Sequence, residues 1–322
     1  MPVARVLPLA ACLGIVPLLA ACVVHVDSGG FSSRKEQRFS VEGAPIVDLD
    51  TFDGAIEVRA WDEGDVLVRV ETRASSKALL ESIDVQMEQS GSQVTVKAVA
   101  SEGGGWDLST GGMSRSARLV ASVPADSTIR LRSGDGSIHV ERVRGRIDAH
   151  TGDGRIVMRQ VTGDVVADTG DGSIQVEDVD GRCLVSTRDG SVLVSGRLRG
   201  GLKASSGDGS VTVRASVGSE LSEAWDIETG DGGVMLTLPE QLDARLDART
   251  NDGRISLNGL PELPIERDGE ARSLQAVLGA GTHALRIRTG DGSITLKRAH
   301  VPQPPAPPAP PAPPPPPAPP AL

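Results

Sequence analysis

The chain has 322 residues, with 33 basic and 43 acidic side chains and a formal net charge of −10. This charge argues against nucleic acid or an anionic membrane surface as a partner held by bulk electrostatics. Aromatic residues make up only 2% of the chain, so it has few of the flat rings on which sugars and bases stack. Glycine is frequent, with 38 residues, which indicates many tight turns.

The N-terminus has the pattern of an export signal. A positive charge at Arg5 precedes an apolar run over residues 6–21, which two prolines interrupt and which is too short to span a membrane. The run ends in Leu19-Ala20-Ala21-Cys22, which resembles the lipobox of bacterial lipoproteins. That resemblance implies cleavage before Cys22 and acylation of its thiol and of the new amine. Because Val23, not Asp, follows, it also implies the outer membrane; an ordinary cleaved signal peptide is the alternative.

We therefore predict a signal peptide over residues 1–21 and a tether from the lipidated Cys22 over residues 22–40. Of the other two cysteines, Cys12 is removed with the signal peptide, so Cys183 has no partner for a disulfide. Cys183 occupies a position that is Ile, Val or Leu in equivalent repeats. We expect it to be a small core residue and not a nucleophile.

Residues 41–130 are predicted to form an irregular β-strand cap. Apolar and polar residues alternate in four segments of this region, as in half-buried strands: 55–60, 66–72, 93–99 and 117–123. Residues 77–83 favour one or two helical turns. We expect the region to cover the open end of the repeats that follow, because an exposed strand edge can pair with other chains. A diverged copy of the repeat opens it at Thr51-Phe52-Asp53-Gly54.

A Thr/Ser-Gly-Asp-Gly turn motif recurs through residues 131–298, with successive Asp residues 18, 18, 18, 19, 23, 21 and 39 apart. Apolar residues lie nine apart, as at Ile138, Ile147 and Ile156, so each 18-residue coil holds two short strands. Identical turns at a fixed period superpose when coils stack in parallel. The sequence therefore predicts an all-β fold: a parallel β-solenoid of the β-helix or β-roll type, right-handed, with about 18 residues per coil.

Two irregular spacings and a change of composition mark the end of the repeats. We expect loops that bulge from the solenoid at residues 216–225 and 258–273. Of the 22 prolines, 14 lie after residue 300. Residues 299–322 are therefore predicted to be a disordered Pro/Ala-rich tail of extended, polyproline character, because such a composition cannot build a core.

The Gly-Asp-Gly-Ser-Ile and Val-x-Gly-x-Ile half-coils, and the strand at residues 119–124 that leads into them, resemble a known bacterial family. It is the "putative adhesin" family of β-strand-repeat proteins, catalogued as domain of unknown function 4097. The resemblance covers residues 44–297 and implies a parallel β-helix in the cell envelope. Adhesion in this family is a label drawn from shape, so the resemblance supplies little mechanism.

The turn aspartates should stack along one edge of the solenoid; they are Asp135, Asp153, Asp171, Asp189 and Asp208. Carboxylates about 5 Å apart repel by roughly 1 kcal/mol in water, so some interaction must offset the repulsion. We expect each Asp to accept hydrogen bonds from the amides of its own turn. Bound Ca²⁺ is the weaker alternative, because calcium β-rolls place Asp where this chain has Gly. We predict no cofactor and no metal site.

In the strands that precede these turns every second side chain points inward, and the threonine at the start of each turn falls on an inward position. We expect their hydroxyl groups to form a ladder that closes the corner of each coil, and not an exposed ice- or sugar-binding surface. The column comprises Thr151, Thr169, Thr187, Thr229, Thr250 and Thr289.

No enzyme signature stands out, and we predict no catalytic residues. The five histidines lack metal-ligand spacing, and neither a nucleophile elbow nor a Walker loop is present. We expect a monomeric, lipid-anchored, non-enzymatic envelope protein that acts as an adhesin or surface-binding module, with weak contacts that add by avidity. Its partners would be the membrane, through the lipid, and an envelope glycan, peptidoglycan or a surface protein, not nucleic acid. The alternatives are a periplasmic scaffold or stress-sensing component, and a polysaccharide-processing β-helix enzyme.

Overall fold

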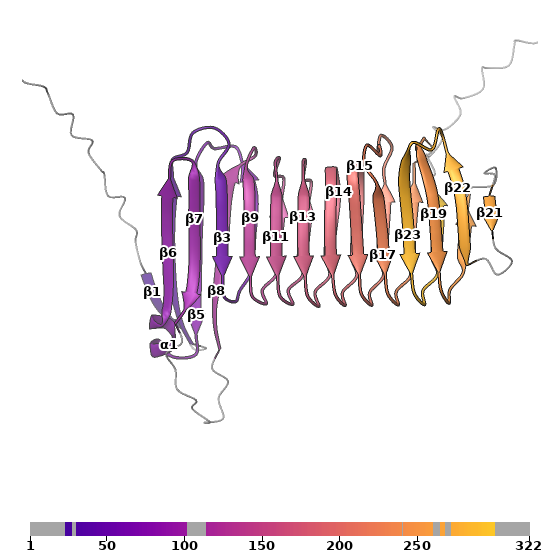
Figure 1. Ribbon diagram of the computed structural model, residues 1–322. Helices are drawn as coiled ribbons and strands as arrows, with labels where there is room; N and C mark the ends of the chain where they lie inside the picture. Colours follow the sequence, from indigo (N-terminus) through magenta and orange to yellow (C-terminus); the bar gives the residue numbers. More distant parts are fainter. Residues whose placement is uncertain are drawn as a thin grey trace, which may run out of the picture.

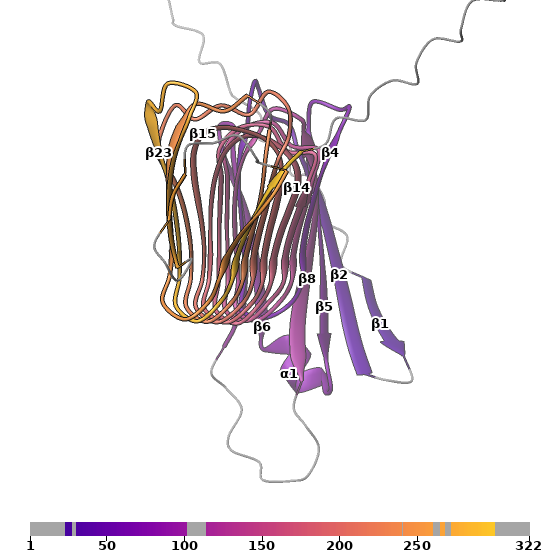
Figure 2. The ribbon, with the colours of Figure 1, turned by 90° about the vertical axis from the view of Figure 1, so that its right-hand side faces the viewer.

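The computed structural model describes residues 23–27, 30–101, 114–239, 241–259, 265–267 and 272–299. These residues form 24 β-strands and one five-residue helix, α1 (Lys77–Glu81), so the all-β prediction is confirmed. The strands lie in two rows that face each other, and the rows join into a nearly closed sheet (Figures 1 and 2). The predicted signal peptide with Cys22, and the predicted tail beyond residue 299, lie outside the described residues.

We name the rows A and B, and two long strands, β14 and β15, run through both. From the N-terminal end of the stack, row A contains β6 (Ile83–Ser90), β7 (Gln93–Ala100), β3 (Ile46–Thr51), β9 (Thr128–Ser133), β11 (Ile147–Thr151), β13 (Val165–Thr169), β14 (Ile174–Thr187), β15 (Val192–Ser206), β17 (Trp225–Thr229), β23 (His283–Thr289), β19 (Ala244–Thr250), β22 (Ser273–Leu278) and β21 (Ile265–Arg267). Row B contains β1 (Val23–Asp27), β2 (Gly30–Phe39), β5 (Val66–Ala74), β8 (Arg115–Pro124), β4 (Ile56–Trp61), β10 (Ile138–Glu141), β12 (Ile156–Arg159), β14, β15, β16 (Val211–Ala215), β18 (Val234–Leu238), β24 (Ile294–Arg298) and β20 (Ile255–Asn258).

The regular part of each row is parallel and in register. Ile156 lies between Ile138 and Ile174 in row B, so equivalent residues of successive repeats are direct neighbours. In row A, Cys183 follows Val165 in the same way. Inward side chains from both rows form one buried core, and Cys183 is fully buried in it, as expected from its position in the repeat.

Stacking order departs from chain order at the N-terminal end. In row A, β3 lies between β7 and β9 and is parallel to both. In row B, β4 lies between β8 and β10 and is parallel to both. The predicted cap over residues 41–130 therefore contains strands that belong to the regular stack. The diverged motif at 51–54 was the signal for this, because it can superpose on the turn of a later coil.

A similar exchange occurs at the C-terminal end. Of the last two described strands, β23 lies between β17 and β19 in row A, and β24 lies between β18 and β20 in row B. Antiparallel strand β22 pairs with β19 on the outer side, and β21 pairs with β22. The predicted loop at 258–273 thus contains a strand, whereas residues 216–224 do form a loop.

Antiparallel strands close the N-terminal end of the stack. β2 pairs with β5, β5 pairs with β8, and β6 pairs with β7. Helix α1 packs beside β2 and β5, and the Ser76 hydroxyl caps it by accepting the Leu79 amide at 3.2 Å. In Figure 2, β1, β2 and β5 splay away from the parallel stack. Among the described residues, no helix has the length and apolar character needed to span a membrane.

Candidate functional site

The turn edge, which we define as the stacked Thr/Ser-Gly-Asp-Gly turns, runs along the stack where the row A strands end (lower edge in Figure 1). Thr187 shows its construction: its Oγ1 lies 3.0 Å from the Gly170 carbonyl oxygen and 2.8 Å from that of Gly172 in the preceding turn. The same hydroxyl accepts the Gly190 amide at 3.2 Å. The inward threonine column is therefore confirmed; its members are Thr151, Thr169, Thr187, Thr229, Thr250 and Thr289, all at most 7% exposed.

Thr187→Val should lower the free energy of unfolding by about 1–3 kcal/mol. Valine keeps the shape but can neither donate to the two glycine carbonyls nor accept the Gly190 amide, and these groups are buried in the corner. Urea denaturation of the full chain measures the difference. Thr212→Val, on the outer face of β16, is the control and should change stability by less than about 0.5 kcal/mol. Equal losses would contradict the role of the hydroxyl ladder.

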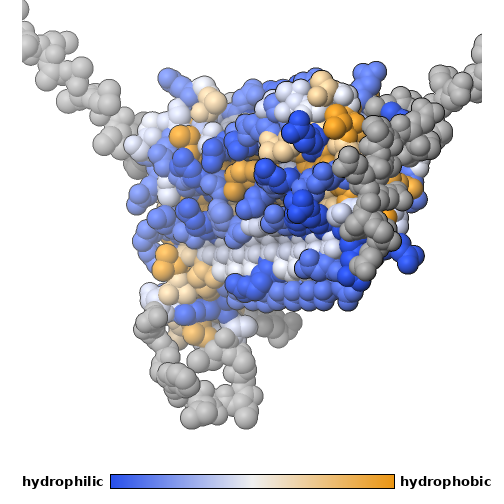
Figure 3. Space-filling model, turned by 45° about the vertical axis from the view of Figure 1, so that its right-hand side comes forward, coloured by the Kyte–Doolittle hydropathy of each residue, from blue (hydrophilic) through white to orange (hydrophobic). Residues whose placement is uncertain are grey.

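Glycines of the turn edge touch backbone in the neighbouring turn. A Cβ on Gly154 would lie 2.0 Å from the Gly136 carbonyl oxygen, and one on Gly172 would lie 2.0 Å from that of Gly154. Because no side chain fits at that separation, this row of the edge is bare backbone. In Figure 3, light and blue rows run along the lower part of the stack, where these turns lie.

The five candidate aspartates, Asp135, Asp153, Asp171, Asp189 and Asp208, are all exposed beside this glycine row. Their expected hydrogen bonds to the turn amides are absent from the described structure, because the threonine or serine hydroxyl occupies that position, as in the bond from Gly190 to Thr187. Asp171 alone of the five has an ion pair there, with Arg188 at 3.5 Å. Among the described residues, no three His, Cys, Asp or Glu side chains converge to hold a metal ion, so the calcium alternative gains no support.

Cys183 is unsuited to nucleophilic chemistry, since burial raises the pKa of its thiol to about 12. In a Cys12→Ala/Cys22→Ala background, we expect Ellman's reagent at pH 8 to detect no thiol in the folded protein and one after denaturation in urea. A thiol that reacts at the rate of a small-molecule thiol before denaturation would contradict the buried position.

The outer face of row B carries a ladder of alternating charges across four neighbouring strands. Arg59 on β4 pairs with Glu141 on β10 at 2.8 Å, and Arg159 on β12 pairs with Glu177 on β14 at 2.9 Å. Hydrogen bonds from Gln175 and Arg159 hold the pKa of the Glu177 carboxyl below its ordinary value. Opposite charges on adjacent strands favour this register over slipped ones.

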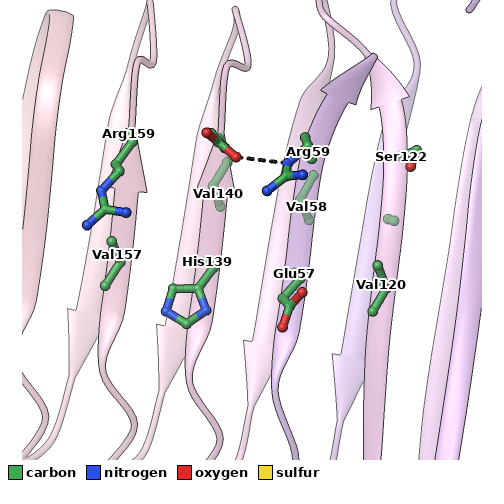
Figure 4. A pocket seen from close by; sticks show the side chains of 11 residues that line it. Glu57, Val58, Arg59, Val120, Ser122, His139, Val140, Val157 and Arg159 are labelled. Atoms are coloured by element: carbon green, nitrogen blue, oxygen red, sulfur yellow. Dashed lines mark hydrogen bonds and ion pairs between the residues drawn. The ribbon is translucent and has the colours of Figure 1, made fainter.

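A hollow of about 510 Å³, which we call the wall hollow, opens on the same face over β8, β4, β10 and β12 (Figure 4). Val120 and Val157 form its apolar part, and Val157 is only 8% exposed although it points outward. Longer side chains stand around it, among them His139 and the Arg59–Glu141 pair. The wall hollow offers paired donors and acceptors around a small apolar floor, which suits binding of a polar molecule.

Sequence reasoning missed the wall hollow. Strand alternation indicates that Glu57, His139 and Val157 point outward, since each follows an inward Ile. It does not indicate that β4 and β10 are neighbours, because 76 or more residues separate them in the chain and β4 falls in the predicted cap. Only the stacking order brings these side chains together.

The toastrack family DUF4097 matches residues 47–297 of the chain. Among solved structures, a protein from Bacteroides fragilis described as a putative adhesin matches at 12% identity and a TM-score of 0.37, over 83% of this chain and 97% of that one. A protein from Parabacteroides distasonis described as a putative lipid binding protein matches at 11% identity and a TM-score of 0.43, over 82% and 96%. A search of curated proteins found no match.

Proposed function

The chain belongs to the toastrack family DUF4097, and from that premise we propose that it is a non-enzymatic binding module of the bacterial cell envelope. A lipid on Cys22 would hold it to the outer membrane, and its rigid stack of strands would present a partner-binding surface. We propose that this stack is a right-handed β-solenoid with about 18 residues per coil, in keeping with the in-register pairing of residues 18 apart. We expect a monomer.

The observation that carries this proposal is the position of the first and last described strands in the stack. Strand β1 begins at Val23, one residue after the proposed lipid site, and pairs with β2 at the N-terminal end. Strand β24 ends at Arg298 and lies next to β20, the last strand of row B at the opposite end. With the anchor at one end and the Pro/Ala-rich segment at the other, the outer faces of rows A and B would not lie against the membrane.

We place partner binding on the wall hollow, and an envelope glycan is the partner class that we favour. Side chains such as His139 and the Arg59–Glu141 pair supply donors and acceptors for hydroxyl groups. Few aromatic rings are available for stacking, so each contact would be weak, and avidity between many copies on one membrane would supply the strength.

Protease accessibility on intact cells tests the display. An epitope placed after the exposed Asn258, on terminal strand β20, reports the far end of the stack. A matched epitope after Gly91, in the exposed turn between β6 and β7, reports the anchored end. If the protein faces outward, protease removes the Asn258 epitope from intact cells, and the Gly91 epitope no faster.

Protection of both epitopes until the outer membrane is opened would contradict surface display. The periplasmic scaffold would then become the working interpretation. Permeabilised cells serve as the control, because loss of both epitopes there shows that each can be cut.

A further inference from the structure

A second hollow, of about 600 Å³, lies toward the C-terminal end of the stack. The segments that line it precede strands of row A, so they lie at the edge opposite the turn edge, which is the upper edge in Figure 1. Three segments line this upper hollow: residues 219–221, before β17; 241–243, before β19; and 279–283, where the chain passes from β22 into β23. None of the three segments has the Val-x-Gly sequence that forms this corner in the regular coils, as at residues 143–145 between β10 and β11. The stack itself does not require them, because the regular coils close without such residues.

The upper hollow has an apolar floor and a fixed rim. Leu221 is 7% exposed, and Leu242 is partly buried against the core. Asp243 ties the rim together, since its carboxylate accepts the Thr282 amide at 2.9 Å and the Thr282 hydroxyl at 3.0 Å. These hydrogen bonds lower the pKa of the Asp243 carboxyl, so it stays ionised at neutral pH.

The rim carries more acidic than basic groups. Its lining contains two carboxylates, Glu220 and Asp243, one histidine, His283, and neither Lys nor Arg. The charge of His283 also helps to lower the pKa of the Asp243 carboxyl. Among the described residues, neither carboxylate forms an ion pair. Arg199, which lies beside Glu220 in the neighbouring coil, pairs instead with Asp180 at 3.2 Å. A cation with an apolar stem would therefore complement both the rim and the leucine floor.

We propose that the upper hollow binds a lysine side chain of a peptide partner, with its methylenes against Leu221 and Leu242 and its ammonium group between Glu220 and Asp243. An ammonium group suits this rim, because it has three rotatable donors for carboxylate oxygens. Ca²⁺ fits less well, since it takes six to eight oxygen ligands and the lining provides only these two carboxylates.

Titration of the full chain with Nα-acetyl-lysine amide tests this site. We expect saturable NMR shifts of the Glu220, Leu221 and Thr282 amides, with a Kd on the order of 1 mM for so small a probe. The same probe acetylated on its side-chain amine keeps the stem but loses the charge, and it should produce no saturable shift below about 20 mM, well above that Kd.

Two matched variants locate the charge. Glu220→Gln should weaken binding by about three- to fivefold, as for loss of one exposed ion pair. Glu223→Gln removes a carboxylate from the same loop that pairs instead with Arg182, and should leave the Kd unchanged. Equal weakening by both variants, binding of the acetylated probe, or no saturable shift with the charged probe would overturn the proposal. These outcomes do not depend on the proposed anchoring or display.

Discussion

Gly172→Ala should destabilise the protein by about 3 kcal/mol or more, or prevent it from folding. The new Cβ would lie 2.0 Å from the Gly154 carbonyl oxygen, 2.6 Å from its carbon and 2.9 Å from the Asp153 oxygen, all of them backbone atoms. Backbone in a stacked turn cannot move aside without disturbing the hydrogen bonds to the next coil. Urea denaturation, together with the yield of folded protein, measures the effect.

Gly64→Ala provides the matched control. A Cβ at Gly64 would meet nothing within 4 Å, so this change should shift stability by less than about 0.5 kcal/mol. If Gly172→Ala behaved like Gly64→Ala, the close contact between turns would be contradicted.

Trp225→Ala should cost about 3–5 kcal/mol. Trp225 is fully buried, and its indole N–H donates to the Gly200 carbonyl at 2.9 Å. Its ring fills the core where the 216–224 loop returns to row A, so removal leaves both a cavity and an unpaired carbonyl. Trp225→Phe retains most of the volume and should cost less, about 1–3 kcal/mol for the unpaired group. Thermal and urea unfolding distinguish the two variants.

Trp61→Ala is the comparison on a less buried tryptophan. Trp61 also donates to a backbone carbonyl, that of Asp65 at 2.9 Å, and Arg38 lies over its ring at 5.2 Å. Since the ring is partly exposed, we expect a loss of only about 1 kcal/mol. A loss equal to that of Trp225→Ala would contradict the assignment of Trp225 as the core anchor of the loop.

Much of the local structure could be predicted because the sequence has two periods, one of two residues and one of 18 residues. Alternation within strands placed Cys183 and the threonines inside, and recurrence every 18 residues placed Ile138 beside Ile156. The expected hydrogen bonds to the turn aspartates were wrong because two side chains compete for one amide. The inward hydroxyl of Thr187 occupies the Gly190 amide, and the neighbouring Asp189 remains exposed.

The order of coils at the two ends could not be predicted from the same periods. Turns of similar sequence can stack on one another in any order, so the motif at 51–54 is compatible with several neighbours. Both hollows depend on that order: the wall hollow requires β4 beside β10, and the upper hollow requires β23 between β17 and β19. Long-range pairing is what short-range patterns do not encode.

Attachment through Cys22 is the most direct test of the proposed function. We predict that the wild-type protein takes up labelled palmitate and sediments with outer membranes, and that Cys22→Ala loses the label and the outer-membrane location. The control for misfolding is tryptophan fluorescence of the Cys22→Ala variant. In the folded variant Trp225 should fluoresce as a buried tryptophan. Wild-type protein without label, or a Cys22→Ala variant that remains in the outer membrane, would contradict the lipid anchor.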